Sequence, residues 1–334
     1  MDVVSLYTNI PHSYGIQAVK EMIEENNTMT VNPELISEML QFILTKNYFE
    51  FNGQYYLQIC GTAMGSKVAP SYANITMGKL ERQILENYTP APDNWKRFID
   101  DVRFMWQHGL DQLKQFHQYC NSVHPTLQFT LEYSDEQISF LDTLMTLTED
   151  KIETTVYNKP TDKHSYLWTT SCHPSHTFQA IPWSQSLRYR RICSNDDLFQ
   201  TEATKLKNHL IKRNYKPRTI SDAIKKAENI NRSKLIQPTS SIKPTTHKRI
   251  PFVIEYNPTL PHIPSIIRKH WNKKLLQSNQ ATSKVFKEKP VIAYRQSANL
   301  KKLLVQAKVN QTKDPAQNNT GQCNRAINAT SAHL

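Results

Sequence analysis

The chain has 334 residues, enough for two or three domains with cores of their own. Its charge is unevenly distributed: residues 1–150 carry 9 Lys and Arg against 19 Asp and Glu, whereas the remainder carries 32 against 10. Because an acidic part suits metal ions and a basic part suits a polyanion, nucleic acid is the favoured partner. No stretch approaches 18 consecutive apolar residues, which argues against a membrane partner. Five widely spaced cysteines and no signal peptide predict a reducing, intracellular location.

The chain begins with an acid at the start of a β-prone run, Asp2-Val3-Val4-Ser5-Leu6-Tyr7. We expect Val3 to Leu6 to form a central strand, with Tyr7 five residues beyond the acid. Apolar stripes at helical spacing follow over residues 16–23 and 35–43. The Asn52-Gly53 pair predicts the turn of a hairpin over residues 48–59.

A glycine-punctuated loop occupies residues 61–74 and leads into a helix that we expect to reach about Asn87. Gly65 lets the backbone approach a ligand closely, and Lys67 is placed to meet a phosphate. Pro70 is placed to open the helix, since proline is favoured in the first turn.

Two adjacent acids lie between two β-favouring runs in Phe98-Ile99-Asp100-Asp101-Val102-Arg103-Phe104, which predicts a hairpin whose turn presents carboxylates. Taken alone, such a pair is most often a solvated turn. Two carboxylates about 4 Å apart repel by roughly 4 kcal/mol at an effective dielectric near 20, so confining them requires divalent cations or partial protonation. Mg²⁺ is the expected guest, because it prefers one or two carboxylates together with substrate phosphates. Acid, glycine-rich loop and acid pair, in that order, indicate a polymerase.

Further along, we expect a helix over residues 109–122 and strands over residues 129–133 and 138–147. Residues 151–234 are basic and helical. Three arginines stand close together there, as expected of a surface that follows a sugar-phosphate backbone, with a solvated basic face as the alternative: Arg188, Arg190 and Arg191. Residues 235–250 predict a linker, and residues 310–334 predict a disordered tail.

These ordered motifs resemble the reverse transcriptases of Penelope-like retroelements, from Asp2 to about Val309. Asp2 matches the first catalytic motif, Asp100-Asp101 matches the third, and the second is matched by Met64-Gly65 through Pro70 and by Asn74. Further matches are Phe140-Leu141-Asp142, residues 159–167 (KPTDKHSYL) and residues 171–176 (SCHPSH).

The resemblance implies an α+β fold with a right-hand polymerase palm, an antiparallel sheet packed against helices, over residues 1–148. A basic, mostly helical thumb is expected over residues 149–234 and an extended C-terminal connector over residues 235–309, before the tail of residues 310–334. The family carries a fingers region before the first motif and a GIY-YIG endonuclease after the connector. We therefore expect this chain to be a truncated copy or a fragment.

The resemblance also implies an RNA-directed DNA polymerase that extends a primer 3′-hydroxyl by two-metal nucleotidyl transfer. The implied catalytic residues and metal ligands, for two Mg²⁺ ions that Mn²⁺ can replace, are Asp2, Asp100 and Asp101. The implied nucleotide-binding residues are Tyr7, Met64, Gly65 and Lys67. Tyr7 would exclude a 2′-hydroxyl, and the three arginines would contact nucleic acid. The implied partners are an RNA template, a DNA primer and deoxynucleoside triphosphates, in the nucleus.

Two other functions remain open at this stage. The first is a catalytically inactive copy that only binds nucleic acid. The second is an RNA-templated RNA polymerase, which Tyr7 disfavours, because such an enzyme would carry a small or polar residue there; an ordinary core tyrosine is the alternative interpretation of Tyr7. The sequence does not specify the oligomeric state.

Overall fold

The computed structural model describes residues 1–26, 31–149, 151–237, 251–259, 263–271, 290–295 and 304. The chain divides into two compact units, and the division falls between Ser134 and Asp135. The sequence placed this boundary after residue 148. The strands on either side of that point, β8 (Thr143–Leu147) and β9 (Ile152–Val156), pair with each other along their whole length and so belong to one unit.

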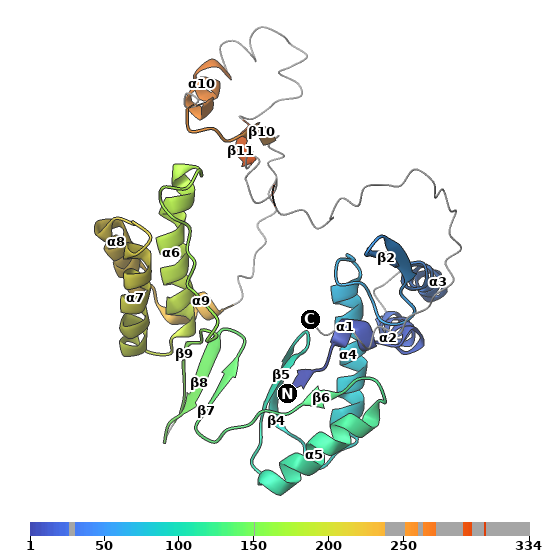
Figure 1. Cartoon of the computed structure of the whole chain (residues 1–334). Coiled ribbons are helices and arrows are strands. Elements are labelled where there is room, and N and C mark those ends of the chain that lie inside the picture. The colour runs from blue at the N-terminus through green and yellow to red at the C-terminus, as the bar shows by residue number, and fades with distance from the viewer. Residues whose placement is uncertain are drawn as a thin grey trace, which may run out of the picture. The chain divides into compact units, whose positions relative to one another are not determined.

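The first unit contains a four-stranded antiparallel sheet in the order β4-β5-β1-β6. Figure 1 shows α4 and α5 beside this sheet. Apart from α1 to α3 and the β2–β3 hairpin, the elements follow the order β-α-β-β-α-β, the split βαβ arrangement. The elements are β1 (Asp2–Val3), α1 (Leu6–Asn9), α2 (His12–Glu25), α3 (Pro33–Thr45), β2 (Tyr48–Phe51), β3 (Gln54–Leu57), α4 (Ala69–Glu86), β4 (Asp93–Phe98), β5 (Asp101–Met105), α5 (Leu110–Val123) and β6 (Phe129–Thr130).

One face of this sheet packs on the helices. Val3 of β1, Val102 of β5 and Phe129 of β6 are buried in one core with residues of α4 and α5, among them Met77 and Phe116. Because side chains alternate between the two faces of a strand, the residues next to Val3 and Val102 point away from this core. The sheet therefore directs the acidic side chains of β1 and β5 to its other face.

Several sequence predictions for this unit are confirmed. Helices α2 and α3 form where the two apolar stripes predicted them, and α4 begins with Pro70 in its first turn and ends at Glu86. The second stripe is not the buried face of α3, however, because α3 buries Leu40 and Leu44 and leaves Phe42 66% exposed. The β2–β3 hairpin closes through Asn52 (φ 50°) and Gly53 (φ 75°), as a primed two-residue turn requires.

The expected strand from Val3 to Leu6 is wrong in extent. β1 ends at Val3, and Ser5 adopts a left-handed conformation (φ 47°). The Ser5 carbonyl then accepts a hydrogen bond from the Thr8 amide (3.1 Å), which opens the short helix α1. Tyr7 consequently lies on a helix and not at the end of a strand.

The second unit joins an antiparallel meander to a cluster of helices. The strands lie in the order β7-β8-β9, and α6, α7 and α8 pack around one core that includes Phe199, Leu206 and Ile220. The elements are β7 (Gln137–Phe140), β8, β9, α6 (Ser175–Ile192), α7 (Asp196–Ile211), α8 (Pro217–Glu228), α9 (Arg232–Ile236), β10 (Pro251–Glu255), α10 (Ile263–His270) and β11 (Val291–Arg295), with β10 and β11 paired in parallel.

The mixed architecture with antiparallel sheets and packed helices agrees with the predicted α+β class. The thumb expected over residues 149–234 is mostly helical in the structure after its first strand, β9. Most of the predicted linker and the whole predicted tail lie outside the described residues. Among the helices that the structure describes, none is both long and apolar enough to cross a membrane.

Candidate functional site

Two of the predicted carboxylates lie directly opposite each other in the first sheet. β1 pairs with β5 in the register that sets Asp2 against Asp101. The flanking hydrogen bonds run from the Val3 amide to the Asp100 carbonyl (3.1 Å) and from the Val102 amide to the Met1 carbonyl (2.8 Å). Asp2 and Asp101 therefore form a non-hydrogen-bonded pair, the type in which side chains approach most closely.

The third carboxylate sits on the adjoining turn. Strands β4 and β5 close between Phe98 and Asp101, so that Ile99 and Asp100 form a two-residue turn. This confirms the predicted hairpin, with Asp100 in its turn and Asp101 at the first position of β5. Ile99 has a φ of 56°, a backbone conformation that is rare for a β-branched residue.

The electrostatics of the pair follow from this register. Burial raises the pKa of Asp2, and the neighbouring negative charges of Asp100 and Asp101 raise it further. The terminal ammonium group of Met1, which donates to the Val102 carbonyl (2.9 Å), acts in the opposite direction. Like charges placed directly across two strands are destabilising, so a cation bound between them would relieve a repulsion already present in the fold.

The three carboxylates offer oxygen donors of the kind that Mg²⁺ prefers. Within the described ranges, no three His, Cys, Asp or Glu side chains are gathered as a ready metal cage. Mg²⁺ does not need such a cage, because it commonly takes one or two carboxylates and fills its other positions with water and substrate phosphates. Asp2, Asp100 and Asp101 fit this chemistry.

The glycine-rich loop packs directly against α1. The Thr62 amide donates to the Tyr7 carbonyl (2.6 Å), and the Gly61 amide donates to the Ile10 carbonyl (3.1 Å). Gly61 has a φ of 71°, and a Cβ atom there would lie 2.4 Å from the Tyr7 carbonyl oxygen. The sequence pattern predicted a role for Gly65 and none for Gly61, although a glycine that opens a loop is an ordinary signal of positive φ.

The predicted nucleotide-binding residues occupy the outer part of this loop. Met64 is 73% exposed, and Gly65 and Lys67 are also exposed. Around Gly65 the described protein leaves open space where a Cβ atom would lie. Tyr7 is partly buried against the first core. The structure thus brings Tyr7 next to the base of the loop and leaves residues 64–67 accessible to a ligand.

Alanine substitutions of Gly61 and Gly65 distinguish a glycine that packs against backbone atoms from one that borders open space. Gly61→Ala is expected to destabilise the first unit by about 2 kcal/mol or more, because it combines a left-handed backbone with a clash against backbone atoms. Gly65→Ala is expected to change stability by less than about 0.5 kcal/mol. Thermal unfolding followed by circular dichroism measures both, and equal destabilisation by the two variants would contradict the packing described here.

In the second unit, Phe140-Leu141-Asp142 forms the end of the β7–β8 hairpin. Phe140 pairs with Thr143, so Leu141 (φ 55°) and Asp142 form its turn. The Arg188 guanidinium donates twice to Asp142 Oδ2, from Nε (2.9 Å) and from Nη2 (2.7 Å). Arg188 therefore fastens the hairpin to α6.

The other two predicted nucleic-acid contacts differ from each other in exposure. Arg190 is only 9% exposed, donates to the Ile230 carbonyl (3.1 Å), pairs with Asp196 and lies over the Phe199 ring. Its surroundings make it a structural residue of the helical core, contrary to its predicted place on the binding surface. Arg191 is exposed at the end of α6.

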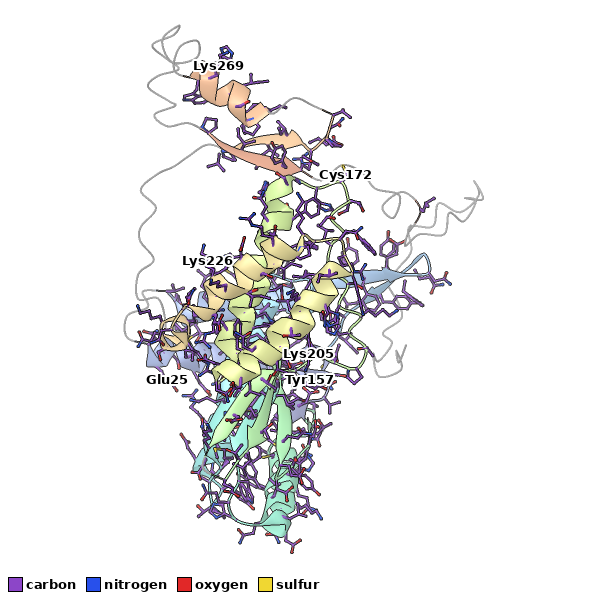
Figure 2. The ribbon with its side chains drawn as sticks, turned by 90° about the vertical axis from the view of Figure 1, so that its left-hand side faces the viewer. Glu25, Tyr157, Cys172, Lys205, Lys226 and Lys269 are labelled. Atoms are coloured by element: carbon purple, nitrogen blue, oxygen red, sulfur yellow. The ribbon has the colours of Figure 1, made fainter. Side chains whose placement is uncertain are left out.

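The accessible cations lie further along, where α7 turns into α8. Ile220, Ala223 and Ala227 bury one side of α8, which leaves its opposite side to solvent. Figure 2 shows Lys205 on α7 and Lys226 on α8; Lys205 pairs with Glu202 (2.6 Å), and Lys226 lies over the Trp183 ring (4.4 Å). Both lysines are exposed, and further exposed cations of this region are Lys212, Lys216, Arg218 and Lys225.

The segment between β9 and α6 packs onto the same turn. The His164 and His209 rings lie 3.9 Å apart between centroids, and burial lowers the pKa of His209. Trp168 is 45% exposed and lies under the Arg213 guanidinium (4.9 Å). An exposed aromatic ring beside cations is a combination that nucleic-acid-binding surfaces use.

Comparison with known proteins bears on this helical region alone. A family described as "Animal helix-turn-helix domain" matches residues 165–225, which include α6, α7 and most of α8. No curated protein matches the chain. The match and the exposed cations together support a nucleic-acid-binding role for this part of the chain.

Proposed function

We propose that this chain is an RNA-templated DNA polymerase of the Penelope-like reverse transcriptase type, which adds deoxynucleotides to a primer 3′-hydroxyl. The observation that carries the proposal is the placement of Asp2 opposite Asp101, with Asp100 on the adjoining turn. The split βαβ order of the first unit supports it, because that order sets the first and third motifs on neighbouring strands.

Each residue has a defined task in this proposal. Asp2, Asp100 and Asp101 would hold two Mg²⁺ ions, which supply activation of the primer hydroxyl and neutralisation of charge on the leaving pyrophosphate. Lys67 would bind a phosphate of the incoming nucleotide, and Met64 and Gly65 would line its pocket. Tyr7 would lie against the sugar and exclude a 2′-hydroxyl, which favours deoxynucleotides over the substrates of an RNA polymerase.

A second candidate function is binding of nucleic acid without catalysis. The helix-turn-helix match over residues 165–225 and the cations near α8 favour binding directly. Incorporation of deoxynucleotides on a primed RNA template in the presence of Mg²⁺ distinguishes the two candidate functions. A polymerase incorporates them and loses this activity in Asp100→Asn, whereas a protein that only binds nucleic acid incorporates none.

Binding by the helical region gives a prediction that both candidates share. Each lysine or arginine that contacts a phosphate contributes about 0.9 to the slope of log affinity against log salt concentration on a duplex. Arg218→Ala is expected to lower that slope by about one, as is Lys216→Ala. Lys46→Ala removes one exposed charge from the end of α3 and serves as the matched control. Gel-shift titrations at several salt concentrations measure the slopes, and identical slopes for Arg218→Ala and unaltered protein would exclude this contact.

A further inference from the structure

We propose that Arg97 is a positioning residue for the turn that carries Asp100, and that it acts by bracing this turn against α4. The inference rests on the proposed polymerase function and adds to it a residue that holds the catalytic turn in place. Arg97 belongs to β4, two residues before Ile99.

The Arg97 side chain joins the turn of the first hairpin to two positions on α4. Its Nη1 atom donates to the Ile99 carbonyl (3.0 Å) on the turn and to Asn74 Oδ1 (2.8 Å) on α4. Its Nη2 atom donates to the Asn74 carbonyl (3.2 Å). Its Nε atom lies 2.9 Å from Glu81 Oε1, which is on α4 about two helical turns beyond Asn74.

The Arg97–Glu81 end of this brace is mostly shielded from solvent, whereas Asn74 is exposed. The side chains of Arg97 and Glu81 are 12% and 15% exposed and form an ion pair. Glu81 Oε1 accepts its hydrogen bond from Trp95 Nε1 (2.6 Å). Partly buried, charge-assisted contacts are stronger than exposed ones. The planar guanidinium group offers several donors in a fixed geometry, which a lysine cannot reproduce.

The turn needs such support because its backbone is unfavourable. Ile99 has a φ of 56°, whereas turns of this kind favour glycine, asparagine or aspartate at a positive φ. A strained residue persists when its surroundings determine its conformation. The Arg97 contact is made to the Ile99 carbonyl, so it directs the turn and occupies no carboxylate oxygen of Asp100.

The second hairpin makes the contrast clear. Its turn, Leu141-Asp142, also begins with a residue at positive φ, but there Arg188 binds the aspartate carboxylate itself. An arginine on the carboxylate fixes the turn and neutralises the acid. Bracing through the carbonyl, as in the first hairpin, fixes the turn while its acid keeps its charge for a cation.

The experiment compares Asn74→Ala and Arg97→Lys with unaltered protein in primer extension. Asn74 is exposed on α4, and alanine is the better helix former, so Asn74→Ala should fold normally. Glu86→Ala, at another exposed position of α4, is the control. Because misplacement of a reacting group by about 1 Å costs about 100-fold, we expect kcat to fall between about 10- and 100-fold in both variants. The Mg²⁺ concentration for half-maximal activity should rise several-fold, and the primer–template Kd should not change.

The outcomes distinguish positioning from folding. Unchanged kcat and Mg²⁺ dependence in both variants would overturn the inference, as would a loss of activity that tracks a lower unfolding temperature with the Mg²⁺ dependence unchanged. If unaltered protein extends the primer and Asp100→Asn does not, the polymerase proposal survives either of those results. If unaltered protein fails to extend the primer, both proposals fall together.

Discussion

Asp100→Asn is expected to abolish primer extension while leaving binding of the primed template almost unchanged. Asparagine has nearly the same size as aspartate and is well tolerated in turns, so the β4–β5 hairpin should keep its register. It removes one of three charges that would hold the metal ions. Metal-assisted charge stabilisation is worth several kcal/mol, which corresponds to a loss of about 1,000-fold or more in rate.

The matched control is Asp111→Asn, which makes the same chemical change at an exposed position in the first turn of α5. Single-turnover extension and a gel shift on the same duplex measure rate and binding separately. Extension by Asp100→Asn at more than a tenth of the unaltered rate would remove Asp100 from the catalytic set.

Tyr7→Ala is expected to relax the choice between deoxynucleotides and ribonucleotides. The hydrogen bond from Thr62 to the Tyr7 carbonyl fixes its backbone against the glycine-rich loop, so the ring is positioned independently of its hydroxyl. A pocket that discriminates through one contact contributes about 1–3 kcal/mol, or about 10- to 200-fold. The ratio of kcat/KM for the two nucleotide classes should shift within that range.

Tyr7→Phe serves as the control, because it keeps the ring and should keep the discrimination. The unfolding temperature of each variant shows whether Tyr7 acts in nucleotide selection or only in packing of the core. If Tyr7→Ala lowers stability and leaves the ratio of kcat/KM unchanged, Tyr7 is only a packing residue.

Local patterns predicted most elements of the first unit. Asn52-Gly53 specifies a turn by backbone preference alone, and the acids of Asp100-Asp101 interrupt two β-prone runs at the point where the hairpin closes. The pairing of Asp2 with Asp101 is different in kind. Pairing across 99 residues depends on tertiary register, which no local pattern specified. The motif resemblance implied only that these acids share one site.

Other features depended on contacts that no local pattern encodes. Ser5 ends β1 through a left-handed conformation that its residue type does not demand. The partners of Arg188 and Arg190 include Asp142 and the Ile230 carbonyl, which lie 46 and 40 positions away. The three clustered arginines were therefore predicted to lie on a binding surface, but Arg190 is buried in the core and Arg188 fastens a hairpin to α6. The cations exposed near α8 belonged to the same basic stretch, but only the helix packing distinguished them.

Deoxynucleotide incorporation by unaltered protein on a primed RNA template tests the central claim most directly. We expect extension that requires Mg²⁺ or Mn²⁺, stops on chelation, and is lost in Asp100→Asn. Retention of the primed template in a gel shift, with no incorporation at any concentration of either ion, would contradict it and make this chain a nucleic-acid-binding protein without catalysis.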